Sequence, residues 1–301
     1  MIKTENWKHI LISAEFVFLV TLISTYMYSL KFVAQKEDKY VHEFDSLDEL
    51  SHSLITCPIQ PQSTDSLRYS ANDNVDKLQA KLRMCPIDED RLGLIDKLRL
   101  DTWLNYHHIE KGGTFKPIGC RPRQKVAIVI PYRDRSEHLE TFTLYMHQFL
   151  PDQLVEYTIY VIEQHDSRPF NRARLFNIGV TEIRKLNPSI CCFIFHDVDL
   201  IPLDQRNLYM CSYMPRHMSP SVSSLRYSLL YPGLFGGVVA FSGKQYDSIG
   251  GFSNDFFGWG GEDDDMFHRV VASGLSIDRT HREHGVYTAL KHPKSQPNKA
   301  K

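Results

Sequence analysis

The sequence lacks an excess of charge of either sign: its 301 residues hold 35 lysines and arginines and 36 aspartates and glutamates, for a formal net charge of -1. A strongly basic chain would suggest nucleic acid or another acidic polymer as a partner, and this balance gives no such argument. We therefore expect no nucleic-acid partner. The length and the 42% of hydrophobic residues suffice for one large domain or two small ones.

The cysteines lack the spacing of a metal cluster, since the chain has no CxxC pair and no cysteine–histidine spacing typical of zinc. This absence favours disulfides, which persist in an oxidising compartment, although their connectivity does not follow from one sequence. The chain also has no internal repeat and no Asn-x-Ser/Thr site, because Pro188 follows Asn187. The six cysteines are Cys57, Cys85, Cys120, Cys191, Cys192 and Cys211.

One long apolar run is present, at residues 10–30, flanked by Lys8 and Lys31 and holding Glu15 as its one ionisable residue. Its length matches the roughly 20 residues of a membrane-spanning helix. A cleaved signal peptide would have a shorter apolar region and a small-x-small cleavage site, which is poorly matched here. We expect an uncleaved anchor, and the lysines of residues 1–9 weakly favour a cytosolic tail.

Beyond the anchor the pattern changes twice. Residues 31–84 are largely polar and are predicted to form a stem, in which a short helix fits at 46–54. From Lys125, apolar β-branched runs alternate with helical spacing, which predicts a mostly parallel α/β sheet covered on both faces, with ligands at the carboxyl ends of its strands. The expected strands are 125–131, 155–164, 191–199 and 234–243, and the expected helices are 136–150 with Ser136 as N-cap, 171–186 and one opening at Gly261.

Charged residues cluster at three of these strand ends. Asp197 and Asp199 follow the third strand, where period-two geometry turns both carboxylates toward the same side, as a hard divalent cation requires. Arg133 and Arg135 follow the first strand, and Arg172 opens the second helix, whose free backbone amides also favour an anion. Singly, each is more often a turn or a surface charge. Together they predict a pocket for a nucleoside diphosphate and a metal.

Five stretches, in order, carry a family resemblance: VAIVIPYRDR, FNRARLFNIG, FHDVDLIP, FGGVVAFS and GWGGEDDDMFHR. They resemble the β1,4-galactosyltransferase family, Golgi type II membrane enzymes that include β1,4-N-acetylgalactosaminyltransferases. The similarity runs from about Cys85 to His292. It implies a single-pass Golgi protein whose lumenal catalytic domain, residues 85–301, has the GT-A fold, a Rossmann-like mixed sheet flanked by helices.

The resemblance also implies roles for individual residues. Asp199 and His292 would bind manganese, and the disulfides would join Cys85 to Cys120 and Cys192 to Cys211, with Cys57 and Cys191 unassigned. Tyr231, Gly261, Glu262 and Asp263 would bind an acceptor ending in N-acetylglucosamine. The residues implied for UDP-galactose or UDP-N-acetylgalactosamine are Pro131, Tyr132, Arg133, Arg135, Phe170, Arg172, Asp197, Val198, Leu234 and Trp259.

An inverting mechanism follows from these roles. An acceptor hydroxyl attacks the anomeric carbon opposite the departing diphosphate, and Asp263, with Glu262 gripping the acceptor, is the expected general base. The metal and the arginines would neutralise the leaving group, so no general acid is needed. Asp264 and Asp265 are expected only to favour the dipole of the helix that they begin.

Three positions depart from the family pattern. Ala289 stands where a methionine metal ligand is usual, so we expect water in its place and selectivity that shifts from manganese toward magnesium. Leu234 stands where a tyrosine is usual, which leaves room for an N-acetyl group on the donor; a neutral core substitution is the alternative. The sequence ends at Lys301, nine residues after His292, where relatives continue into a segment that helps form the acceptor pocket.

Two other functions share part of this pattern. A haloacid-dehalogenase-type phosphohydrolase also has Asp-x-Asp after a strand, but Gly-Thr normally follows it, whereas Leu200-Ile201-Pro202 follows here. The stronger alternative is a catalytically impaired family member that acts as a membrane-anchored sugar-binding protein. The retained nucleotide-site residues favour the enzyme.

Overall fold

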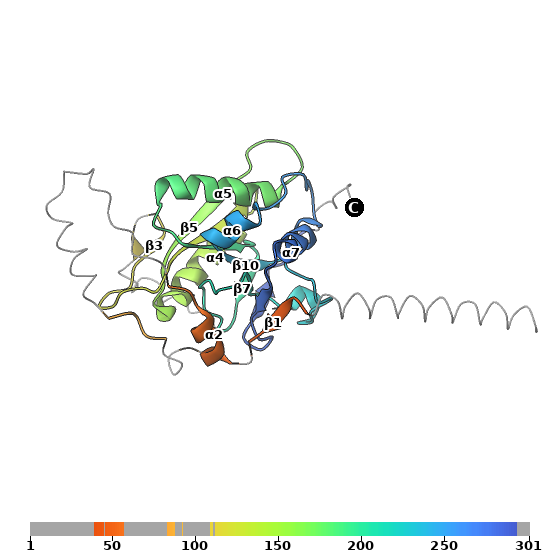
Figure 1. Ribbon diagram of the computed structural model, residues 1–301. Coiled ribbons are helices and arrows are strands. Elements are labelled where there is room, and N and C mark those ends of the chain that lie inside the picture. Colours follow the sequence, from red (N-terminus) through yellow and green to blue (C-terminus); the bar gives the residue numbers. More distant parts are fainter. Residues whose placement is uncertain are drawn as a thin grey trace, which may run out of the picture.

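The computed structural model describes residues 39–44, 46–56, 83–87, 92, 109–110 and 112–293 (Figure 1). Within these ranges no helix has the length and apolar character needed to cross a membrane. The anchor predicted at residues 10–30 lies outside the described residues.

A nine-stranded sheet forms the centre of the fold. Strand β4 (Lys125–Tyr132) pairs in parallel with both β5 (Glu156–Glu163) and β6 (Cys192–His196), as the alternation of strands and helices predicts, whereas β10 (Val238–Ser242) runs antiparallel to β6. The fold is therefore mixed α/β. In spatial order the strands are β1 (Val41–Glu43), β11 (Ile277–Arg279), β8 (Arg216–His217), β10 (Val238–Ser242), β6 (Cys192–His196), β4 (Lys125–Tyr132), β5 (Glu156–Glu163), β3 (Thr114–Phe115) and β2 (Ile109–Glu110).

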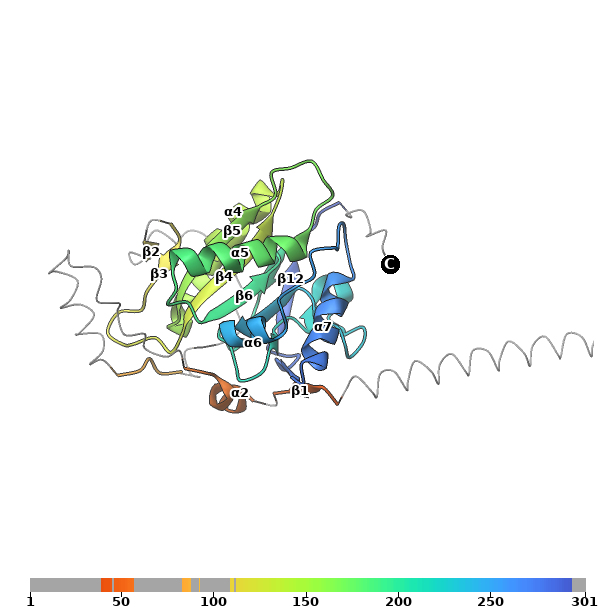
Figure 2. The ribbon, with the colours of Figure 1, turned by 45° about the horizontal axis from the view of Figure 1, so that its top comes forward.

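Helices cover both faces of this sheet (Figures 1 and 2). Along β4, Val126 and Ile128 belong to one apolar cluster with residues of α4 (Ser136–Phe149), while Ala127 and Val129 belong to a second cluster with residues of α5 (Arg172–Leu186). Alternate residues of a strand point to opposite faces, so β4 is buried on both sides and reads as a continuous apolar run. The N-cap of α4 is Arg135 and not Ser136 as predicted, since Ser136 is already the first helical residue.

A smaller sheet packs beside the carboxyl end of β6. Its strands are β7 (Leu200–Pro202), β12 (Val286–Ala289) and β9 (Ser221–Val222), with β12 in the middle. Because β12 pairs with β7, the chain that follows β12 is brought back to the Asp-x-Asp segment. Two further helices, α6 (Gly243–Ser248) and α7 (Glu262–Ala272), follow β10 in the sequence.

Part of the predicted stem belongs to the folded domain. Strand β1 pairs in parallel with β11 at the edge of the large sheet, and helix α2 (Leu47–Ser53) follows it. Phe44 and Leu50 are buried in the main core, and Tyr213 N donates to Ser53 O over 3.1 Å. The packing thus begins well before the boundary that we predicted at residue 85.

Two disulfides have both of their cysteines among the described residues. The structure contains Cys85–Cys120 and Cys192–Cys211, the two pairs that the resemblance implies. Cys191, which the sequence left unassigned, is disulfide-bonded as well. Disulfide use of this kind is typical of proteins that fold in an oxidising compartment.

Candidate active site

The two candidate metal ligands lie together. His292 Nε2 is 2.8 Å from Asp199 Oδ2, although 93 positions separate them in the sequence. The pairing of β12 with β7 and a hydrogen bond from Leu290 N to Asp199 O, 2.7 Å long, bring them into contact. Arg135 Nη2 lies 3.1 Å from His292 Nδ1 on the other side of the ring.

This donor set fits a divalent cation. A carboxylate oxygen and an imidazole nitrogen, both partly exposed, face each other, and such cations commonly complete their coordination with diphosphate oxygens and water. Within the part of the chain that the structure describes, no group of three or more His, Cys, Asp or Glu side chains could hold a metal. Ala289 adds no side-chain donor, and its backbone nitrogen bonds to Ser223 Oγ over 2.8 Å.

Arg172 connects the two sets of carboxylates. Its Nε donates to Asp197 Oδ1 over 2.5 Å, and its Nη1 lies 3.7 Å from Glu262 Oε1. Its Nη2 donates to Gly237 O, and the guanidinium lies over the ring of Phe176. Arg172 is therefore held between a carboxylate that follows β6 and one at the start of α7, and is not simply exposed to an incoming diphosphate as the sequence suggested.

Burial sets the electrostatics of this cluster. It raises the pKa of Asp197 to about 6, against the lowering effect of Arg172 and with a further increase from Asp199. Burial also raises the pKa of Glu262, again opposed by Arg172. Glu262 Oε2 is buried without a hydrogen-bond partner, and a buried unpaired acceptor is the kind of group that a ligand hydroxyl satisfies.

The proposed base, Asp263, occupies the first turn of α7. It is the second residue of that helix, which begins after Gly261 in a left-handed conformation with φ of 96°. Asp263 Oδ1 accepts a hydrogen bond from Asp264 N, and a Cβ added at Gly236 would lie 2.5 Å from Asp263 Oδ2. The glycine before β10 is therefore what lets the carboxylate approach the Phe235–Gly237 segment.

The last two acids of the run have different partners. Asp264 Oδ1 accepts a hydrogen bond from Tyr231 Oη over 2.6 Å, whereas Asp265 Oδ2 accepts one from Arg269 Nε one turn along α7. The expectation that both serve only the helix dipole is incomplete for Asp264, because it ties the predicted acceptor residue Tyr231 to the helix that carries Asp263.

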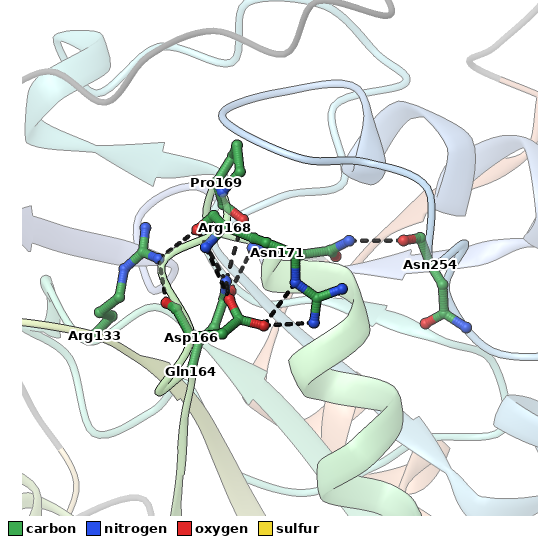
Figure 3. Close-up of polar contacts among 7 residues, drawn as sticks. All are labelled: Arg133, Gln164, Asp166, Arg168, Pro169, Asn171 and Asn254. Carbon is green, nitrogen blue, oxygen red and sulfur yellow. Dashed lines mark hydrogen bonds and ion pairs between the residues drawn. The ribbon is translucent and has the colours of Figure 1, made fainter.

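The residues predicted to bind the nucleotide include Arg133 and Phe170, which lie near the ends of β4 and β5; Figure 3 shows Arg133. A cavity of about 540 Å³ opens there, lined in part by Arg133, Asp134 and Gln164. Arg133 Nη1 donates to Arg168 O over 2.7 Å, and its guanidinium lies 5.4 Å from the centre of the Phe170 ring. An arginine stacked on an aromatic ring at the mouth of a cavity suits a planar base and its phosphates.

The remaining predicted residues are distributed around these groups. Pro131 is buried and Tyr132 half-buried at the end of β4, and Val198 packs into the main core. Leu234 is half-buried, and Arg279 Nη2 donates to its carbonyl oxygen over 3.0 Å. Trp259 is 64% exposed, and its neighbour Gly258 donates to Phe170 O over 2.7 Å.

Two residues of this region were not in the predicted set, Gln164 and Asp264. Gln164 follows β5 and bonds to several backbone groups of the next loop, and Asp264 bonds to Tyr231 as described. The partners of Gln164 lie in an irregular loop, and the partner of Asp264 is 33 positions away, so helix or strand periodicity gave no signal for either residue. A polar residue directly after the second parallel strand is the one feature that could have drawn attention to Gln164.

Comparison with known proteins covers the same region. Residues 95–212 match the N-terminal region of glycosyl transferase group 7, and residues 216–293 match the N-terminal domain of galactosyltransferase. Together the two matches span most of the domain that contains the site.

Individual relatives agree with this. The chain is 44% identical over 187 residues to β-1,4-galactosyltransferase 2 of Homo sapiens, which is 62% of this chain and 50% of the relative. It is 46% identical over 185 residues to a β-N-acetyl-D-glucosaminide β-1,4-N-acetylglucosaminyl-transferase of Lymnaea stagnalis, covering 61% of this chain and 38% of that protein. The chain thus spans about half the length, or less, of these relatives.

A solved structure is also similar. It is a Drosophila β1,4-galactosyltransferase 7 mutant in complex with manganese, UDP-Gal and xylobiose. The two chains are 31% identical with a TM-score of 0.50, over 56% of this chain and 71% of that one.

Proposed function

The chain belongs to the β1,4-galactosyltransferase family, and on that premise we propose that it is an inverting, metal-dependent glycosyltransferase. It moves galactose or N-acetylgalactosamine from the UDP-sugar, in β1,4 linkage, to a terminal N-acetylglucosamine of a glycoprotein or glycolipid glycan. The observation that supports this most is the Arg172 bridge, because one guanidinium contacts both the donor-side Asp197 and the acceptor-side Glu262.

Asp263 is the proposed general base, and Glu262 holds the acceptor. The attacking hydroxyl must lose a proton as it bonds to the anomeric carbon, and a carboxylate on the face opposite the diphosphate takes it, which gives inversion. Gly236 leaves room for this carboxylate, and Glu262 Oε2, buried and unpartnered, offers an acceptor for a second sugar hydroxyl. Tyr231 and Gly261 complete the proposed acceptor side.

The donor side consists of residues from three strand ends. Arg133 and Arg135 neutralise the charge that develops on the departing diphosphate, and Phe170 supports the base. A divalent cation, when held by Asp199 and His292, would supply the same stabilisation as a Lewis acid. The other residues proposed for the donor are Pro131, Tyr132, Arg172, Asp197, Val198, Leu234 and Trp259, the last as part of a lid whose glycines allow closure.

Donor choice rests on Leu234. A leucine in place of a tyrosine beside the donor's C2 substituent leaves space for an N-acetyl group, so the chain accepts UDP-N-acetylgalactosamine at least as well as UDP-galactose. The side chain of Leu234 is half-buried and its carbonyl oxygen accepts a hydrogen bond from Arg279, which supports a fixed position for this residue. Changing Leu234 to Tyr is expected to shift turnover toward UDP-galactose.

Location follows from the proposed organisation. In this organisation residues 1–9 form a cytosolic tail and 10–30 a signal anchor of a single-pass type II Golgi protein. The lumenal catalytic domain, predicted at 85–301, also includes β1 and α2 from the predicted stem at 31–84. The disulfides support exposure to an oxidising lumen.

The full-length chain, assayed in detergent with manganese and an N-acetylglucosamine-terminated acceptor, tests this function. Turnover of UDP-galactose and UDP-N-acetylgalactosamine is compared for the wild type and Leu234→Tyr. Transfer from both donors, with the ratio moved toward galactose in the variant, supports the proposal. Transfer from neither donor, with UDP still bound, would instead favour a sugar-binding protein.

A further inference from the structure

The loop between β5 and α5 is organised by one side chain, that of Gln164. Its Nε2 donates to Asp166 Oδ1 over 2.8 Å and lies 3.2 Å from the carbonyl oxygens of both Arg168 and Pro169. Its Oε1 accepts from Asn171 N over 2.9 Å (Figure 3). A single amide therefore closes the loop from its first residue to the N-cap of α5.

The same loop carbonyls hold Arg133. Its Nη1 donates to Arg168 O over 2.7 Å and to Asp166 O over 3.4 Å, and these contacts bring the guanidinium over Phe170. If the carbonyl of Arg168 turns away, Arg133 loses the acceptor that orients it. Because a flexible arginine then has to be ordered by the ligand itself, affinity for that ligand falls.

The loop is also fastened to the lid segment. Asn171 Nδ2 donates to Asn254 O over 2.7 Å, and Phe170 O accepts from Gly258 N over 2.7 Å. Gly258 directly precedes Trp259. The loop is thus bonded both to Arg133 at the end of β4 and to the chain before α7.

We infer that Gln164 is a positioning residue for the donor nucleotide: it fixes the 164–171 loop so that Arg133 and Phe170 are ordered before the nucleoside diphosphate binds. The inference rests on the proposed function only in taking UDP as that ligand. Gln164 belongs to the surface loop and not to the apolar core, so its replacement leaves the fold intact.

The test is calorimetric titration of the full-length chain in detergent with UDP and manganese. Gln164→Glu keeps an oxygen for Asn171 N but turns the donor amide into a carboxylate, which repels Asp166 and the loop carbonyls. Gln164→Ala removes all of these bonds. Gln148→Glu on α4, where the amide donates to Leu144 O, is the matched control for the chemical change.

Both Gln164 variants are expected to weaken UDP binding by about tenfold, because the hydrogen bonds that order the 164–171 loop are lost. The melting temperature and the acceptor KM should be unchanged. Gln148→Glu should bind like the wild type. Wild-type affinity in both Gln164 variants, or an equal rise in the acceptor KM, would overturn the inference while leaving the proposed function standing. A wild-type chain that binds no UDP would overturn both.

Discussion

Tyr231 Oη donates a hydrogen bond of 2.6 Å to Asp264 Oδ1, and this contact joins the segment before β10 to the first turn of α7. Asp263, the proposed base, is the preceding residue of the same turn. The acceptor-side aromatic ring and the base are thus held in a fixed relation by an acid that the sequence alone presents as one of four equivalent charges.

Replacing Asp264 with Ala should therefore raise the acceptor KM. The bond that orients Tyr231 is lost, and a charge-assisted hydrogen bond is worth about 1.5–3 kcal/mol, so an increase of about tenfold is expected in steady-state kinetics. Asp265→Ala is the control, because its partly exposed i,i+4 pair with Arg269 contributes only about 0.3–0.5 kcal/mol. Equal kinetics for the two variants would contradict the orienting role.

Gly236→Ala should reduce kcat without unfolding the protein. The new Cβ would lie 2.5 Å from Asp263 Oδ2, so the carboxylate must move, and misplacing a general base loses part of its effect of about 10²–10⁴-fold. Gly243→Ala serves as the comparison, since its Cβ would meet the flexible end of Arg184 at 3.2 Å. An unchanged kcat in Gly236→Ala would show that Asp263 does not need its present position.

Ala289→Met should sharpen the preference for manganese over magnesium. A thioether beside Asp199 and His292 adds a soft ligand, and soft ligands discriminate against magnesium. Activity is titrated with each metal in the wild type and in the variant, with Ala289→Leu as a size control. The account fails here if the wild type already requires manganese strictly, or if methionine and leucine act alike.

His147 should make the fold sensitive to acid. Burial lowers its pKa from 6.5 to about 4, so between these values the unfolded chain binds a proton that the folded chain does not. His147 therefore costs the fold almost no stability above pH 6.5. As the pH falls toward 4 it lowers the free energy of unfolding, by about 2 kcal/mol at pH 5. His196 and His217 are shifted in the same direction and add to the slope.

Urea unfolding at pH 7 and pH 5 measures this effect. His147→Gln should narrow the difference in unfolding free energy between the two pH values, whereas His52→Gln, whose side chain is 80% exposed, should leave it unchanged. A difference that is the same in His147→Gln and the wild type would show that this histidine does not titrate as described.

The sequence predicted the centre of the fold well and its edges poorly. Long apolar runs such as 125–131 give strong periodic signals, and their order along the chain specifies the parallel core. Strand β1, Val41–Glu43, and strand β11, Ile277–Arg279, are short and polar, so they are strands only because tertiary structure pairs β1 with β11 and β11 with β8.

In the candidate site, too, some residues could be predicted from the sequence and some contacts could not. Asp197 and Asp199 are recognisable as an Asp-x-Asp pattern after an apolar strand, but the strand predicted over 191–199 ends at His196, and both aspartates lie in the turn before β7. Their position in a turn means that the period-two alternation of a strand does not align their side chains. The contact of Asp199 with His292 is expected from the family resemblance. The partner of Asp264, Tyr231, is 33 positions away in the sequence, and no local spacing encodes that contact. The partners of Gln164 lie in its own loop, but they depend on the irregular path of that loop and not on a periodic pattern. Arg172 was foreseen as a cation near phosphate, but its engagement with Asp197 and Glu262 is a property of the folded chain.

The stereochemistry of the product tests the central claim most directly. Full-length chain, manganese, an α-linked UDP-sugar and an N-acetylglucosamine-terminated acceptor are incubated, and the new linkage is read by NMR. The wild type is predicted to form a β1,4 linkage. In Asp263→Asn the rate of transfer should fall by about 10²-fold or more. An α-linked product, or an undiminished rate in Asp263→Asn, would contradict that claim.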